Sequence, residues 1–173
     1  MEEEKQLEFW LRGPVPGIIP VLQPVAHALL QARWEVQQAL SDFPVDLLWQ
    51  RPGGVASVAF HLQHLAGVLD RLFTYAKGNQ LSDWQLIELQ KEGKEDDNIH
   101  LDGLLQHFDR QVESAIDQLK NTTAASVQEA RAVGRKQIPS TVLGLLFHAA
   151  EHTQRHTGQL LVTAKVLIGH KGS

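Results

Sequence analysis

Four long stretches of the sequence repeat apolar residues every three or four positions, and this periodicity constrains the fold more than any other feature. The spacing places the apolar side chains of each stretch on one face of an α-helix. No stretch shows a convincing β-strand pattern, so the sequence predicts an all-α fold, an antiparallel four-helix bundle. The predicted helices run from residue 21 or 24 to 42, from 57 to 77, from 101 to 119 and from 139 to 168.

The apolar stripes of the first three helices predict where the core lies. Their apolar side chains recur alternately three and four positions apart, which keeps them on one helix face. The predicted core residues are Val25, Leu29, Ala32, Val36, Ala39 and Phe43 in the first helix, Val58, Leu62, Leu65, Leu69 and Leu72 in the second, and Leu101, Leu105, Phe108, Val112, Ala115 and Leu119 in the third.

Capping and breaking residues mark the ends of these helices. Pro44 ends the first helix, because proline cannot continue the hydrogen-bond ladder. Ser57 can cap the second helix with its hydroxyl, and Gly78 is a suitable stop for it.

Two connections between the helices are long for a bundle, and long loops often cover a site. The first contains a short predicted helix over residues 82–91, followed by a charged run over residues 91–97. We expect that run to be a solvated loop. The second connection covers residues 121–139 and is polar at first.

Length and the N-terminal prolines bound the domain organisation. At 173 residues the chain suits one domain with a single core, so residues 1–173 are expected to form one unit. Four prolines between positions 14 and 24 prevent a continuous helix there. Residues 1–20 are therefore expected to be a proline-rich, ordered lead-in, and residues 169–173 a short tail.

Composition excludes several classes of function. The net charge of −4 gives no reason to expect nucleic acid or an anionic membrane as a partner. The absence of cysteine leaves imidazole and carboxylate as the available metal ligands. Because the sequence shows neither a secretory start nor an apolar run long enough for a bilayer, we expect a soluble, cytoplasmic protein.

Histidines recur every fourth residue in the fourth helix, at His148, His152 and His156. Side chains four apart share a helix face, where a pair can hold one metal ion. His152 and His156 fall on the predicted core-facing stripe, and His148 lies one position off it. An unsatisfied buried imidazole costs roughly 1–3 kcal/mol, so the pair needs a common partner. That stripe is Leu145, Ala149, His152, His156, Gln159, Thr163 and Val166.

A third metal ligand would have to come from another helix, since such sites usually combine three protein ligands with one open position. His61 and His64 on the second helix are the candidates, and spacing alone does not choose between them. Three imidazoles without thiolates suit zinc, nickel, iron(II) or cobalt. A simpler interpretation also stands, because core histidines are often only hydrogen-bonded and histidine pairs at this spacing occur by chance.

Two segments, SVAFHLQHLAGVLDRL in the second helix and EHTQRHTGQL in the fourth, resemble the DinB-like superfamily of metal-binding four-helix-bundle proteins. Its members share a histidine on the second helix and a histidine pair on the fourth, often followed by Gly-Gln. The resemblance covers most of the chain and implies metal ligands at His64, His152 and His156. The residues that it places near the ligands or in a pocket are His61, His148, Gln159 and Arg71.

The resemblance implies a metal-dependent transferase. Some members add bacillithiol, mycothiol or glutathione to an electrophile, others are described as hydrolases, and many have no known activity. We therefore expect a homodimer that joins a low-molecular-weight thiol to a small-molecule substrate, with zinc or nickel as the first choice of metal and iron or cobalt as others. Arg71 could meet an anionic cosubstrate, although an ion pair with a nearby carboxylate is the simpler role.

Two other functions remain open. Water in place of the thiol would make the protein a metal-dependent hydrolase, but neither Glu151 nor Asp70 has a helix position that suits the required base. The second is a non-catalytic metal-binding stress-response protein, in which the ion fastens the second helix to the fourth.

Overall fold

The chain is mostly helical, as the sequence predicts. The computed structural model describes residues 6–171 and, within the last helix, side chains up to residue 169. Its helices are α1 (Gln23–Leu40), α2 (Val58–Ala76), α3 (Asp83–Lys91), α4 (Leu101–Lys120) and α5 (Val142–Lys171), its strands are β1 (Ala130–Val133) and β2 (Ile138–Thr141), and short 3-10 turns cover Phe9–Leu11, Pro20–Leu22, Val45–Leu47, Pro52–Gly54 and Ser126–Gln128.

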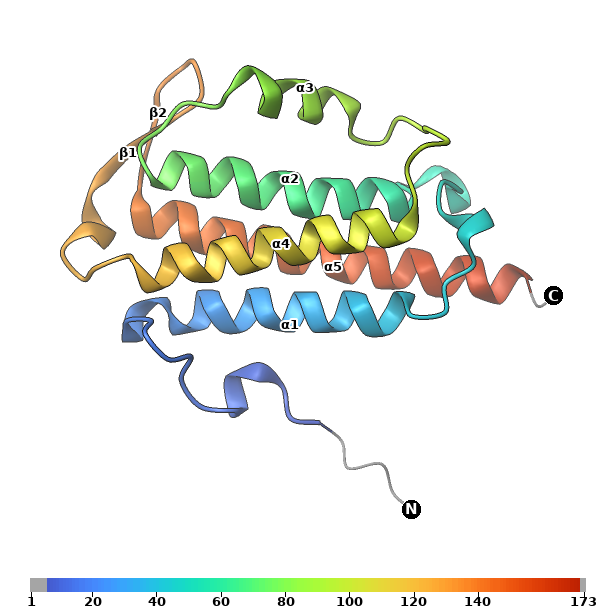
Figure 1. The fold of residues 1–173 in the computed structure, drawn as a ribbon, viewed down its shortest axis with the longest axis horizontal. Helices are drawn as coiled ribbons and strands as arrows, with labels where there is room; N and C mark the ends of the chain where they lie inside the picture. The colour runs from blue at the N-terminus through green and yellow to red at the C-terminus, as the bar shows by residue number, and fades with distance from the viewer. Residues whose placement is uncertain (1–5, 172–173) are drawn as a thin grey trace.

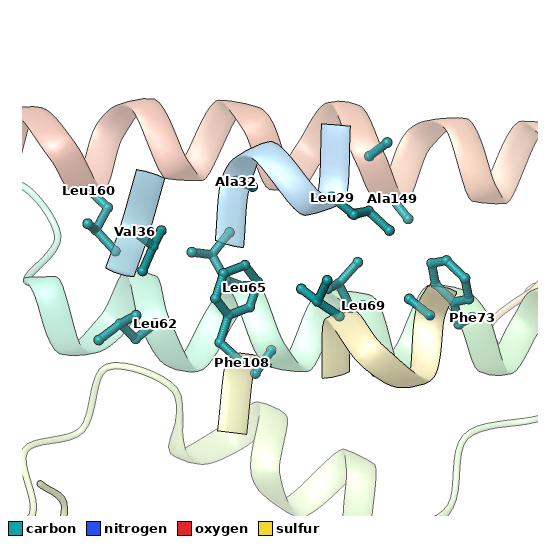
Figure 2. Packing of buried hydrophobic residues seen from close by; sticks show 14 of the residues in the cluster. Leu29, Ala32, Val36, Leu62, Leu65, Leu69, Phe73, Phe108, Ala149 and Leu160 are labelled. Carbon is teal, nitrogen blue, oxygen red and sulfur yellow. The ribbon is translucent and has the colours of Figure 1, made fainter. Parts of the chain in front are cut away.

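The four long helices lie side by side, and α3 lies alongside α2 on its outer side (Figure 1). Helix α5 packs against α1 and α2, and α4 packs against the same two helices. Apolar side chains from all four helices meet between them (Figure 2). Each large side chain buried there contributes roughly 1.5–3 kcal/mol. The fully buried ones include Phe108, Leu22, Leu29, Leu40, Leu62, Leu65, Leu69, Leu119, Leu146 and Leu160.

The helix boundaries follow the predicted capping chemistry. The hydroxyl of Ser57 accepts a hydrogen bond from the backbone N–H of Phe60, as expected for the cap of α2. Ser82 and Gln85 form a capping box at the start of α3, in which each side chain bonds the backbone of the other. Gly78 follows α2 with a φ of +82°, a left-handed conformation that glycine adopts without strain.

The connection between α4 and α5 contains a β-hairpin that the sequence reading missed. β1 and β2 pair antiparallel, with Ala132 opposite Pro139. Each strand has four residues and one contains proline, so neither gives a recognisable alternating pattern. The hairpin is tied to the bundle because Arg131 Nε donates a 2.8 Å hydrogen bond to the carbonyl oxygen of Ala76 at the end of α2.

Helix α5 begins later and ends later than predicted. Residues 139–141 belong to β2, so the helix starts at Val142, and it continues through Lys171 instead of stopping near residue 168. The part of the predicted tail from 169 to 171 is therefore helical, and residues 172–173 lie outside the described residues. Although α5 has 30 residues, no helix in the described part of the chain is long and apolar enough to cross a membrane.

The proline-rich lead-in is ordered against α1 over residues 6–20, as expected, while residues 1–5 lie outside the described part. The side chain of Gln23 accepts a 2.7 Å hydrogen bond from the N–H of Val15 and donates to the carbonyl oxygens of Val15 and Ile18. Ile18 is buried in the core. The lead-in thus extends the apolar cover of α1.

Candidate metal centre

The face that α5 turns to the core matches the predicted stripe at Leu145, Ala149 and Thr163, but not in its middle. Thr153 and Thr157 are fully buried, whereas His152 and His156 are half-buried and Gln159 is exposed. Because α5 packs against both α1 and α2, its buried surface is wider than a single stripe. The histidines lie at the edge of this surface, on the side that faces α2.

Three imidazoles from two helices converge at that edge. His64 of α2 and His152 and His156 of α5 are all half-buried, and one ligand atom of each lies within 4.8 Å of the others. His64 Nε2 is 2.8 Å from His152 Nε2. The ring centroid of His64 lies 4.3 Å from that of His156 and 5.1 Å from that of His152. These three histidines are the ones that the family resemblance implies as ligands, and the fold brings them together.

A buried carboxylate orients His64. Glu92 Oε2 lies 2.7 Å from His64 Nδ1, so the ionised carboxylate keeps the ring proton on Nδ1 and leaves Nε2 free of hydrogen. The side chain of Glu92 is only 9% exposed, which corrects the expectation that the run 91–97 is simply a solvated loop. The local sequence does not predict the burial of Glu92, because this residue lies in a run of charged residues. Its contact with α2 depends on the tertiary structure.

Arg71 holds the other oxygen of the same carboxylate. Its Nη1 lies 2.7 Å from Glu92 Oε1, and the two side chains are 10% and 9% exposed. Burial raises the pKa of Glu92, but the His64 hydrogen bond and the Arg71 charge outweigh burial and leave the pKa below its usual value. Arg71 therefore has the simpler of its two predicted roles, an ion pair with a nearby carboxylate.

Two glycines make room for this carboxylate. Gly93 has a φ of +78°, and a Cβ there would lie 3.0 Å from the Phe60 ring. Its backbone N–H donates a 2.8 Å hydrogen bond to Gln63 Oε1 of α2. A Cβ on Gly67 would lie 2.5 Å from both Arg71 Nη1 and Glu92 Oε1. The α3–α4 connection thus approaches α2 closely only because both positions lack side chains.

His61 supports the third imidazole. It is 3% exposed, and its Nδ1 lies 3.3 Å from His156 Nδ1. Burial, with a smaller effect of His64, lowers the pKa of His61 to about 4. Burial and then the neighbouring histidines lower the pKa of His156 to about 4 as well. Both rings are therefore neutral at pH 7, which is the form that binds metals.

These residues fit a divalent metal ion. Burial, followed by the charge of His64, lowers the pKa of His152, so it too favours the neutral form. Its Nδ1 is buried and has no hydrogen-bond partner among the described residues. Three imidazole nitrogens, one of them on a ring fixed by a carboxylate, are a donor set that zinc and similar ions accept. Nitrogen atoms this close repel one another through their lone pairs unless a proton or a cation lies between them.

The other predicted residues lie around the three histidines without joining them. His148 is exposed, and its Nδ1 lies 3.6 Å from Glu151 Oε2. Its ring centroid is 5.4 Å from that of His152, so it flanks the site. Gln159 is exposed and lines a pocket of about 700 Å³ that opens beside His156. The lining residues are Val55, Ala56, Phe60, His61, Arg155, His156, Gly158, Gln159, Val162 and Thr163.

Comparison with known proteins assigns the family. The sequence model of the DinB superfamily matches residues 28–160, and the chain belongs to that superfamily. Its fold is similar to that of a conserved protein from Enterococcus faecalis, known from a crystal structure, with a TM-score of 0.69 and 18% sequence identity. That alignment covers 87% of this chain and 99% of the other. A comparison with curated proteins found no match.

Proposed function

We propose that this protein binds one divalent metal ion through His64, His152 and His156 and transfers a low-molecular-weight thiol to an electrophilic small molecule. The observation that carries the proposal is the convergence of three imidazoles, one held by a buried carboxylate, beside an apolar pocket. Zinc and nickel suit this donor set best, and iron or cobalt would also be accepted. We further propose that the long helices form an antiparallel four-helix bundle and that the protein is a homodimer, as the family resemblance implies.

The surrounding residues keep the ligands ready to bind. Glu92 fixes the tautomer of His64, and a ring with its Nδ1–H bonded in this way presents Nε2 as a ligand. The contact between His61 Nδ1 and His156 Nδ1, 3.3 Å long, holds the His156 ring in place beside α2. The first contact joins α2 to the loop after α3, and the second joins α2 to α5. Because these contacts already hold the imidazole rings, metal binding would need to order few side chains.

The proposed reaction follows from the three imidazole ligands and from the absence of cysteine in the chain. A bound divalent ion of this kind lowers the pKa of a thiol that it binds, so that the thiolate forms near neutral pH. The chain has no cysteine, so the sulfur must come from a cosubstrate. That sulfur would form a bond to the electrophilic carbon while the bond from this carbon to its leaving group breaks, and the leaving group would keep the bonding electrons. The thiol proton would pass to solvent or to the leaving group. The pocket beside His156 would hold the electrophile.

Hydrolysis is the weaker proposal, because it needs a general base near the site. Glu92 uses both carboxylate oxygens, one on His64 and one on Arg71. Glu151 is paired with Arg155 on the exposed face of α5. The low pKa of His61, about 4, makes that ring a poor base at neutral pH.

Metal analysis combined with activity assays tests the proposal. Purified wild-type protein, reconstituted with zinc or nickel, should hold about one ion per chain. His64→Gln should lose it, while His107→Gln on α4, a half-buried histidine outside the site, should keep it. A panel of bacillithiol, mycothiol and glutathione with simple electrophiles should show transfer that chelation abolishes and metal restores. Equal metal content in the two variants would disprove the ligand set. Bound metal with ester hydrolysis but no thiol transfer would favour the hydrolase.

A further inference from the structure

The pocket beside His156 is mainly apolar and lies between the beginning of α2 and the second half of α5. It is lined by Val55, Ala56 and Phe60 from the beginning of α2 and the residues before it, and by Val162 of α5. Val55 and Val162 are 53% and 63% exposed, so the pocket leaves apolar surface in contact with water. An apolar ligand that covered this surface would be stabilised by removing it from water.

The pocket adjoins the candidate metal centre. One of the three candidate ligands, His156, lines it directly, and so does His61. Phe60 lines it too, and its ring stacks on that of His64 with a centroid distance of 5.3 Å and an interplanar angle of 10°. A molecule in the pocket would therefore contact the ring of His156 directly and lie against Phe60, which stacks on His64.

The pocket lining includes one positively charged side chain. Among the ten lining residues, Arg155 is the one permanently charged side chain, and none is a carboxylate. The partner of Arg155, Glu151, does not line the pocket and engages one side of the guanidinium group. Gln159 adds an amide donor one turn further along α5. The guanidinium and amide donors suit a carboxylate or a similar anionic group.

We propose that this pocket binds the acceptor substrate, an apolar small molecule of about 10–20 non-hydrogen atoms with a carboxylate at the end near Arg155. Its apolar body contacts Phe60 and Val162, and its reactive end lies at His61 and His156. Its role as the acceptor rests on the proposed transferase function. Binding itself needs only the pocket, so the two claims can be tested separately.

Gly158 offers a way to close the pocket without touching the histidines. It lines the pocket, it is exposed on α5, and a Cβ placed on it would meet nothing within 4 Å. A leucine there should fold normally and occupy ligand space. Gly169 on the same helix also has open space around its Cβ position and lies outside the pocket, so Gly169→Leu is a matched control.

Calorimetric titration of metal-free protein with 4-phenylbutyrate and 4-phenylbutan-1-ol tests the assignment. Both probes share one apolar body, and only the first carries a carboxylate. We expect dissociation constants of about 0.1–1 mM, with the acid bound roughly threefold to tenfold more tightly. Gly158→Leu should weaken both probes more than tenfold, and Gly169→Leu should change neither. Arg155→Gln should remove the preference for the acid and leave the alcohol unaffected.

The outcomes separate this inference from the proposed function. If Gly158→Leu, shown to be folded by circular dichroism, binds both probes like wild type, the pocket assignment is wrong even if metal and thiol transfer are found. If the acid and the alcohol bind equally well to wild type, the proposal that the ligand carries a carboxylate is wrong. If the probes behave as expected but the protein holds no metal, the ligand pocket stands and the transferase proposal falls. Should Gly158→Leu not fold, Val162→Trp closes the same space and is judged by the same criteria.

Discussion

Gly67 occupies the one place on α2 where a side chain would separate Arg71 from Glu92. A Cβ there would lie 2.5 Å from the end of each of these side chains, and both ends can move aside without disturbing the backbone. Alanine favours a helix over glycine by roughly 0.5–1 kcal/mol. Gly67→Ala should therefore move the carboxylate that orients His64, and the gain in helix propensity should offset part of the stability lost when the buried ion pair of Arg71 and Glu92 is displaced.

The metal affinity of Gly67→Ala should fall by about 10- to 100-fold, the usual effect of losing a residue that supports a metal ligand. Competition with a chromophoric chelator measures the affinity, and urea unfolding of the metal-free protein measures the stability. Gly103→Ala on α4 is the control, since a Cβ there meets nothing within 4 Å. An affinity equal to that of wild type would show that the position of Glu92 does not matter for binding.

The buried hydroxyl group of Thr153 should lower the stability of the fold. It is 0% exposed, and its Oγ1 has no hydrogen-bond partner among the described residues. Thr153→Val keeps the shape and removes the unsatisfied group, so it should raise the free energy of unfolding by about 1 kcal/mol. Thr74→Val should do the opposite, because Thr74 Oγ1 donates to the carbonyl oxygen of Asp70 and accepts from Gln85. Urea unfolding of both variants checks the signs, and a destabilised Thr153→Val would show that the hydroxyl has a partner.

At the scale of elements, the segment from α3 to α4 is weakly attached and yet supplies Glu92. No residue of α3 is buried. Its connection to the site consists of Glu92 with His64 and Arg71, and of Gly93 with Gln63. The loop therefore depends on the same polar contacts that the candidate metal centre needs.

Glu92→Gln separates the two roles of this carboxylate. The amide keeps the shape but leaves the charge of Arg71 buried without its counterion, so the variant should lose about 1–3 kcal/mol of stability and roughly tenfold in metal affinity. Adding Arg71→Met should restore much of the stability, because the unpaired charge is gone, but not the affinity. Unfolding curves and chelator competition on the single and double variants measure both quantities. Recovery of the affinity in the double variant would contradict the orienting role of Glu92.

Sequence periodicity predicted the elements well wherever local chemistry decides the structure. Ser57 caps α2 through its own hydroxyl, and Leu62 and Leu65 are buried as their spacing requires. The predictions were wrong where contacts between distant segments determine which side chains are buried. Thr153 faces the core because α5 packs against two helices at once, which a single stripe cannot show. Glu92 is buried because the fold brings it to Arg71, 21 positions earlier in the chain.

The whole molecule should respond to pH through its buried histidines. Burial holds the pKa of His61 and of His156 at about 4 in the folded protein, below the ordinary value of 6.5. Above pH 6.5 both states carry neutral rings, so these groups add no pH dependence. As pH falls from 6.5 towards 4, the unfolded chain takes up protons that the folded protein does not, and metal-free stability declines. The limit is about 1.4 kcal/mol per pH unit for each histidine, and the half-buried His156 should contribute less because solvent screens it.

His61→Gln should flatten this decline, because the most buried of the titrating rings is gone while a polar side chain remains near His156. Urea unfolding of metal-free protein between pH 7.5 and 4.5 gives the slope for each variant. His148→Gln, on the exposed flank of the site, should follow the wild-type curve, since that ring is 54% exposed. A His61→Gln slope as steep as that of wild type would mean that acid sensitivity arises elsewhere in the molecule. With metal bound, the loss of stability should be steeper over the same range, because protons then compete with the ion for three imidazoles that share it.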